Sequence, residues 1–178
     1  MRKKFGIGMA AKAAGSTLAL TLSFSTFSTQ TASASTWIQP LKNAGSNLCI
    51  GVDGGSPYDG ALTLQWECNG NPDQTWFWVP TNGGYELQNG NKKCLEAPGW
   101  TTAAGARLGQ WSCHGGANQI WNINDFDNSG RRRVKNANSG LCISNQGGSG
   151  EWGNHIIQWQ CNTAPDQYWD ASGTISIP

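Results

Sequence analysis

One pattern of cysteine, glutamine and tryptophan occurs three times in this chain of 178 residues. In each copy a cysteine is followed after eighteen residues by a second cysteine and, five residues later, by Gln-x-Trp. A glycine lies eleven residues after each first cysteine, and a Gln-Trp pair shortly precedes each second one. The copies begin at Cys49, Cys94 and Cys142, so their spacing is 45 and then 48 residues. Self-similarity at this period indicates a repeat architecture, and three copies in so short a chain favour closure around a pseudo-threefold axis.

The first 34 residues have the features of a secretory signal peptide. The start is basic (Arg2, Lys3, Lys4), the apolar stretch is densest near Leu18, and small residues end the segment at Ala34. Serines and threonines interrupt the apolar run, which falls far short of the ~20 residues of a membrane span. We therefore expect no membrane insertion, a secreted extracellular protein, and a mature part, residues 35–178, that forms one monomeric domain.

Secretion favours disulfide bonds for the six cysteines, all of which fall within the repeats. Six cysteines allow 15 connectivities. Equivalence of the copies favours one bridge per repeat: Cys49–Cys68, Cys94–Cys113 and Cys142–Cys161. The rival interpretation is a zinc site, but the chain has no Cys-x-x-Cys and only two histidines, His114 and His155. We expect no metal and no cofactor.

The charge pattern does not favour a nucleic-acid partner. Without the signal peptide, eight Lys and Arg face eleven Asp and Glu, and a nucleic-acid binder is usually basic over a whole face. The one basic run, Arg131 to Arg133, could contact an anionic polymer, but a solvated loop is the simpler interpretation.

The secondary-structure signals predict an all-β protein. Short β-rich runs alternate with Gly- and Asn-rich turns, and no window carries a helical stripe. The runs are Thr36 to Ile38, Leu62 to Trp66, Thr75 to Val79, Tyr85 to Leu87 and Ile156 to Trp159. With three repeats, at about 37–80, 81–125 and 126–172, this favours a barrel with threefold pseudosymmetry.

The Gln-x-Trp triplets and the paired cysteines resemble the ricin B-chain type lectins and the related carbohydrate-binding modules of secreted bacterial glycosidases. The resemblance covers about residues 37–171 and implies a β-trefoil, with six strands in a short barrel and six in a hairpin cap. It also implies that the tryptophans of the triplets fill the core while the glutamines hydrogen-bond within each repeat. These structural residues are Gln74, Trp76, Gln119, Trp121, Gln167 and Trp169.

Sugar binding requires an exposed aromatic ring for the C–H face of the sugar and polar groups for its hydroxyls. By resemblance, the aromatic residue lies two positions before the second cysteine: Trp66, Trp111 and Trp159. A second contact precedes the triplet glutamine: Asp73, Asn118 and Asp166. The family also has an aspartate two residues after the first cysteine, and here this chain departs, because Gly51, Glu96 and Ser144 stand there.

Because only the middle copy keeps a carboxylate at that position, its set of Glu96, Trp111 and Asn118 is predicted to be the most competent, with Trp100 as a second platform. In the first copy Asp53 and Asp59 could replace the missing acid. The third copy has further candidates, which are Asn145, Gln146 and Trp152. The competing interpretation for each copy is a decayed pocket kept for folding, with its tryptophan packed on the disulfide.

We therefore predict a secreted lectin with up to three shallow sites for galactose-, arabinose- or xylose-containing glycans. No pair of carboxylates recurs at a motif position, as glycoside hydrolysis would need, and neither histidine has a catalytic setting, so we expect no enzyme. The alternative function is a protein-interaction trefoil, such as a protease inhibitor or a subunit of a secreted complex or toxin. It would act through a protruding loop, for example Asn124 to Lys135.

Overall fold

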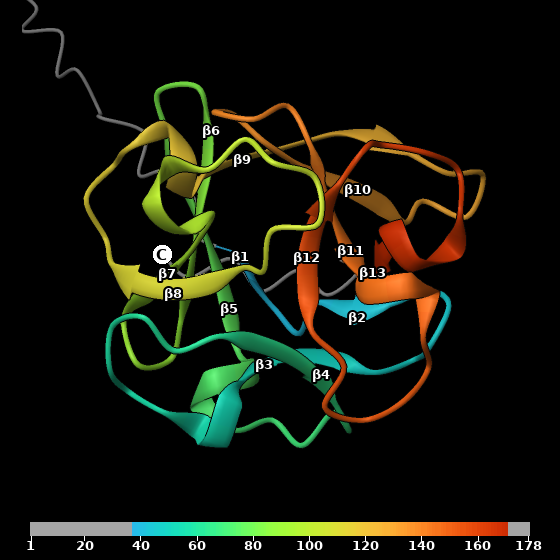
Figure 1. Ribbon diagram of the computed structural model, residues 1–178, viewed down its shortest axis with the longest axis horizontal. Helices are drawn as coiled ribbons and strands as arrows, with labels where there is room; N and C mark the ends of the chain where they lie inside the picture. The colour runs from blue at the N-terminus through green and yellow to red at the C-terminus, as the bar shows by residue number, and fades with distance from the viewer. Residues whose placement is uncertain (1–36, 171–178) are drawn as a thin grey trace, which may run out of the picture. The chain divides into compact units, whose positions relative to one another are not determined.

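The computed structural model describes residues 37–170, and this part of the chain contains thirteen β-strands and six single 3-10 turns (Figure 1). The predicted signal peptide and the last eight residues of the predicted domain lie outside the described residues. The strands of the first copy are β1 (Trp37–Gln39), β2 (Lys42–Asn43), β3 (Cys49–Val52), β4 (Thr63–Trp66) and β5 (Trp76–Thr81). Those of the second are β6 (Gly84–Asn89), β7 (Lys93–Glu96), β8 (Gly109–Ser112) and β9 (Ile120–Phe126). Those of the third are β10 (Arg132–Asn136), β11 (Cys142–Asn145), β12 (Ile156–Trp159) and β13 (Trp169–Asp170).

The first and last strands of each copy form a closed antiparallel ring. Neighbours pair in the order β1, β5, β6, β9, β10, β13 and β2, and the consecutive strands β1 and β2 close the circle. The resemblance implies twelve strands, and the thirteenth arises because Pro40 separates β1 from β2. Proline has no N–H to donate to a strand ladder, so it interrupts the first barrel strand.

The two middle strands of each copy form a hairpin: β3–β4, β7–β8 and β11–β12. In each hairpin the first cysteine lies directly opposite the exposed tryptophan, as in the pair Cys49 and Trp66. Two barrel strands and one such hairpin in each of three copies, six barrel strands and three hairpins in all, constitute a β-trefoil. The predicted all-β class and β-trefoil fold are confirmed.

The core lies inside the barrel, where the three triplet tryptophans are fully buried. Each indole N–H donates to the carbonyl of the residue that follows the first cysteine of its copy: Trp76 to Ile50, Trp121 to Leu95 and Trp169 to Ile143, at 2.9, 3.0 and 3.2 Å. The indole N–H of a buried Trp usually has such an acceptor. One tryptophan from each copy therefore fills the same centre, which no single copy could form alone.

In each copy, the segment that contains the second cysteine is joined to the hairpin by a disulfide and to the Gln-x-Trp triplet by a hydrogen bond of the triplet glutamine. The bridges are Cys49–Cys68, Cys94–Cys113 and Cys142–Cys161, so one disulfide per repeat is confirmed. The triplet glutamines are buried, and each side-chain oxygen accepts from the backbone N–H that follows the second cysteine: Asn69, His114 and Asn162, at 2.8–3.0 Å. Each triplet therefore starts in a fixed 3-10 turn: η2 (Pro72–Gln74), η4 (Ala117–Gln119) and η6 (Pro165–Gln167).

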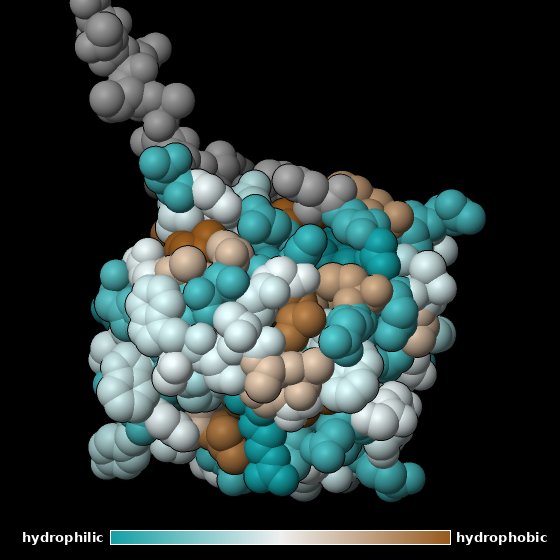
Figure 2. All heavy atoms as spheres, turned by 45° about the horizontal axis from the view of Figure 1, so that its top comes forward, coloured by the Kyte–Doolittle hydropathy of each residue, from teal (hydrophilic) through white to brown (hydrophobic). Residues whose placement is uncertain are grey.

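The face drawn in Figure 2 is covered mainly by polar residues, with apolar residues in small, separate patches. Within residues 37–170 no helix has the length and apolar character needed to cross a membrane. The large apolar side chains that remain exposed are mostly tryptophans, and these define the candidate site.

Candidate functional site

Three equivalent tryptophans stand on the surface of the hairpins. Trp66, Trp111 and Trp159 keep 44%, 44% and 43% of their surface exposed. Each ring lies against the repeated glycine of another copy: Trp66 on Gly153, Trp111 on Gly60 and Trp159 on Gly105, at 3.3–3.6 Å from where a Cβ would stand. Those glycines have φ of 75° to 85°, a conformation that a side chain disfavours. The repeated glycine therefore allows the backbone of one copy to approach the indole of the next.

The glutamine before each exposed tryptophan joins the same two copies. Gln65, Gln110 and Gln158 are fully buried, and the side-chain NH₂ of each donates to two carbonyls in the loop of the other copy. Gln65 donates to Ser149 O at 2.6 Å and to Glu151 O at 2.8 Å. Repetition in the sequence was the signal for this role, but only the structure shows that the bonds cross between copies.

The carboxylate of the first copy lies at the position where the family aspartate is missing. A Cβ at Gly51 would be 2.9 Å from Asp73 Oδ2, so the Asp73 side chain occupies the space that a side chain at Gly51 would need. The backbone N–H of Val52 donates to the same oxygen at 3.1 Å. Asp73 is half-buried beside the exposed Trp66, and both line one cavity.

The third copy repeats this arrangement. The Ser144 hydroxyl donates to Asp166 Oδ2, which places the acid of the 3-10 turn over the small residue on strand β11. The middle copy has the same pair with the roles exchanged: Glu96 stands on the strand, and the Asn118 amide donates to its Oε2 at 3.3 Å. Each copy thus has one carboxylate at this place. Glu96 is therefore not the only carboxylate at this place, and possession of an acid does not distinguish the middle copy from the other two.

Two cavities lie at these acids. The cavity of the first copy has a volume of about 450 Å³ and contains Trp66 and Asp73, with further polar side chains from Asp53, Asn69 and Asn71. That of the third copy, about 560 Å³, contains Trp159, Asp166, Ser144, Asn145 and Gln146. Asn145 also lies in this lining, but its side chain is buried, and its Oδ1, for which the described residues supply no hydrogen-bond partner, is not exposed to the cavity.

The middle copy is more crowded at its acid. Glu96 is only 6% exposed, Asn118 is 1% exposed, and His114 Nε2 lies 3.7 Å from Glu96 Oε2. Trp100 stacks on the His114 ring, with 6.1 Å between centroids. Its φ of +58° is unusual for a side chain of this size, and glycine stands at the equivalent places of the other copies, Gly55 and Gly148.

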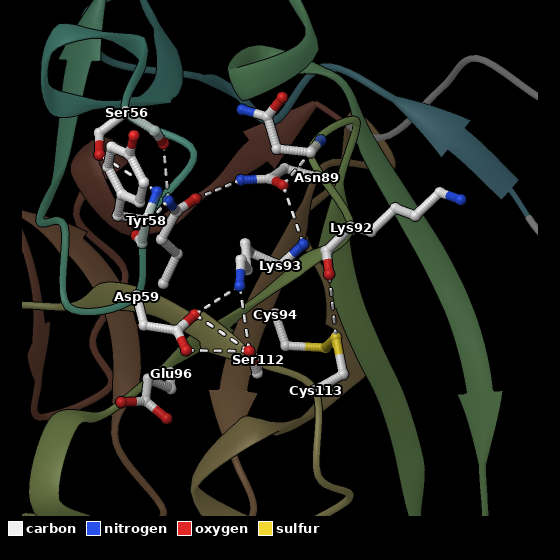
Figure 3. Close-up of polar contacts among 12 residues, drawn as sticks. Ser56, Tyr58, Asp59, Asn89, Lys92, Lys93, Cys94, Glu96, Ser112 and Cys113 are labelled. Atoms are coloured by element: carbon white, nitrogen blue, oxygen red, sulfur yellow. Dashed lines mark hydrogen bonds and ion pairs between the residues drawn. A yellow bond between two sulfur atoms is a disulfide. The ribbon is translucent and has the colours of Figure 1, made fainter.

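The other predicted residues have varied settings. Asp59 faces the middle copy, where it pairs with Lys93 at 2.7 Å and accepts from the Ser112 hydroxyl (Figure 3). The hydrogen bond from Lys93 is the main cause that lowers the pKa of Asp59. Asp59 therefore does not replace the acid of its own copy. Trp152, expected beside the third site, instead contacts Trp66 of the first copy.

The predicted protruding loop, Asn124 to Lys135, is mostly the hairpin β9–β10. Its arginines have partners on the hairpin itself: Arg131 pairs with Asp127, Arg132 lies over the Phe126 ring, and Arg133 pairs with Asp125. A basic run whose charges are engaged in this way resembles a solvated turn more than an anion site.

Residues 37–169 match the sequence profile of the ricin-type beta-trefoil lectin domain. The chain belongs to this family. No curated protein sequence matches it significantly. The ricin-type lectin family is non-catalytic. Similar folds also form part of larger proteins, among them an exo-beta-1,3-galactanase and a mosquitocidal holotoxin.

Solved structures place this lectin domain among β-trefoils. The designed threefold-symmetric protein ThreeFoil is 28% identical, with a TM-score of 0.71 over 74% of this chain and 95% of its own. The exo-beta-1,3-galactanase 1,3Gal43A from Clostridium thermocellum is 26% identical, with a TM-score of 0.72 over 82% of this chain; the match spans only 31% of the galactanase. The C-half of the earthworm R-type lectin, solved with GalNAc, is 12% identical with a TM-score of 0.59, and this likeness shows the fold alone.

Proposed function

We propose that this ricin-type lectin domain is a non-catalytic carbohydrate-binding protein whose sites lie at Trp66, Trp111 and Trp159. The observation that carries the proposal is the repeated combination of an exposed indole and a hydrogen-bonded carboxylate in the same copy. The indole offers a flat apolar surface for the C–H groups of a sugar ring, and the carboxylate accepts from its hydroxyls. Hydrogen bonds from the Val52 N–H, the Asn118 amide and the Ser144 hydroxyl hold the three carboxylates in place before a ligand arrives, which lowers the entropic cost of binding.

The first and third copies carry the main sites in this proposal. Their acids, Asp73 and Asp166, are half-buried in cavities, whereas Glu96 of the middle copy is nearly inaccessible beside His114 and Trp100. Because each site is shallow, we propose that useful affinity arises when two or three sites engage one branched glycan or polysaccharide.

Galactose-containing glycans are the first ligands to test, followed by those with arabinose or xylose. The similarity to a region of an exo-beta-1,3-galactanase supports galactose as the first choice. We further propose that residues 1–34 direct secretion, that residues 35–178 form one domain, and that this domain acts as an extracellular monomer.

A glycan array probed with residues 35–178 tests the function, and calorimetric titration of a ligand found there tests the sites. Trp66→Ala and Trp159→Ala should each weaken binding, with a smaller effect for Trp111→Ala. Phe126→Ala is the matched control, because this ring is also exposed but belongs to the β9–β10 hairpin. Failure of the wild type to bind any glycan would favour the protein-interaction alternative. If Phe126→Ala lowered the sugar affinity as much as the tryptophan variants do, the three tryptophans would not be the specific sugar contacts.

A further inference from the structure

A second exposed tryptophan lies beside the platform of the first copy. The rings of Trp66 and Trp152 have centroids 5.4 Å apart and are inclined by 46°. Both remain accessible, with 44% and 56% of their surface exposed. Two large aromatic rings at the surface contribute little to a core, so their side-by-side position requires another explanation.

Trp152 comes from the third copy and is held firmly at the boundary with the first. It lies in the loop between β11 and β12, and Gln65 of the first copy accounts for the hydrogen bonds on both sides of it. The Gln65 side chain donates to Ser149 O and Glu151 O before Trp152, and the Gly153 N–H after it donates to Gln65 O at 2.9 Å. The backbone that carries Trp152 is therefore fixed before a ligand binds, which lowers the entropic cost of using it as a contact.

The equivalent position in the other two copies carries no aromatic residue. Asp59 precedes Gly60 beside Trp111, and Ala104 precedes Gly105 beside Trp159. The Asp59 carboxylate turns toward Lys93 and Ser112 (Figure 3). The paired platform thus occurs at one of the three boundaries, so the fold itself does not require it.

The cavity of the first copy and the second ring flank Trp66. The cavity is lined by Trp66 together with polar groups, among them Asp73, Asn69 and Asn71, whereas Trp152 stands outside this lining and contacts Trp66 from the neighbouring copy. If one sugar unit of a glycan lies in the cavity, the next unit of that glycan would lie beside the Trp152 ring. Since the two rings are inclined rather than coplanar, the glycosidic linkage must set the two sugar rings at an angle to each other.

We propose that the first copy has an extended site, which binds at least two consecutive sugar units, one on Trp66 in the cavity and the next on Trp152. The inference rests on the proposed sugar-binding function and adds a specificity to it. The first site prefers oligosaccharides or the interior of a polysaccharide over a single sugar, while the third site, with Ala104 in place of Trp152, reads one unit.

The test is a titration of mono-, di- and trisaccharides of the sugar found on the array, in a background with Trp111→Ala and Trp159→Ala so that the first site is isolated. The background protein should bind the disaccharide about tenfold more tightly than the monosaccharide, as one added aromatic contact allows. Adding Trp152→Ala should remove that gain and leave monosaccharide affinity unchanged. Tyr58→Ala, an exposed ring on the equivalent loop of the first copy, is the control and should preserve the length dependence.

A transfer experiment tests the same idea at another boundary. With Trp66 and Trp111 replaced by alanine, Ala104→Trp should give the third site a preference for the disaccharide that the parent lacks. Melting curves verify that each variant is folded. If Trp152→Ala weakens mono- and disaccharide equally, or changes neither, the extended site is refuted while the lectin function stands. If the wild type binds no glycan, both fail.

Discussion

The hydrogen bonds of the Gln65 side chain predict how much the contact between the first and third copies contributes to the free energy of unfolding. In Gln65→Leu the side-chain volume is nearly kept, but three hydrogen bonds are lost: those to Ser149 O and Glu151 O, and the one accepted from the Ser46 hydroxyl at 2.9 Å. At about 1 kcal/mol net for each bond, the free energy of unfolding should decrease by roughly 3 kcal/mol. For a domain of this size that corresponds to a decrease in Tm of about 10 °C.

Urea unfolding followed by tryptophan fluorescence measures this change, and Gln110→Leu is the matched control. Gln110 is equally buried and makes the equivalent three bonds, to Ser56 O, Tyr58 O and Asn89 Nδ2. Both variants should lose similar stability. Only Gln65→Leu should also weaken disaccharide binding at the first site, because only its loop carries Trp152.

A loss of less than about 1 kcal/mol in Gln65→Leu would refute the reasoning, since the three bonds together would then contribute less than one typical hydrogen bond. A large loss in Gln65→Leu beside none in Gln110→Leu would refute the equivalence of the boundaries. The first result would leave the disulfides and the tryptophan core as the main sources of stability.

Three further predictions concern the core, pH and the middle site. Trp121→Ala should lower the free energy of unfolding by roughly 3–5 kcal/mol, against less than about 0.5 kcal/mol for the exposed Trp111→Ala; similar values for the two in urea unfolding would refute the core role. Burial, assisted by Arg107, lowers the pKa of His155 below its ordinary 6.5 although Asp53 opposes the shift. On acidification below pH 6.5 the unfolded chain therefore binds a proton that the folded chain resists. Wild-type stability should fall more steeply in this range than that of His155→Gln, and parallel curves would contradict this. Trp100→Gly relieves a left-handed conformation that costs about 1–2 kcal/mol; it should leave Tm unchanged or higher and strengthen sugar binding at the middle copy, and a clear loss of Tm would show that the stack on His114 outweighs the strain.

Much of the fold was accessible from the sequence because its signals are local and repeated. The cysteine spacing, the triplets and the glycines predict one disulfide per repeat and a threefold barrel, and the structure has both. The count of strands differs by one, because Pro40 interrupts the first barrel strand. That effect is also local, but it lies where the copies do not match, so the repeat pattern gave no signal for it.

The site was only partly accessible. A comparison of the copies in sequence treats each position independently. It therefore indicates that the first and third copies lack an acid, because Gly51 and Ser144 stand where the aspartate is expected. In three dimensions the residue two places after the first cysteine touches the residue before the triplet glutamine, and Asp73 or Asp166 fills the space that the small residue leaves. Two positions that are more than twenty residues apart along the chain thus exchange the carboxylate between them.

By itself, the sequence determined the number of copies, the disulfides and the identity of the aromatic residues, because a repeated spacing reports equivalent local structures. The tertiary structure decided which copy each side chain serves. Closure of the barrel places the third copy against the first, so Trp152 lies beside Trp66 although the two are far apart in sequence. It also decided that Glu96, the acid expected to be most competent, is buried beside His114. Both results depend on contacts between segments distant in the chain, which spacing along the sequence does not encode.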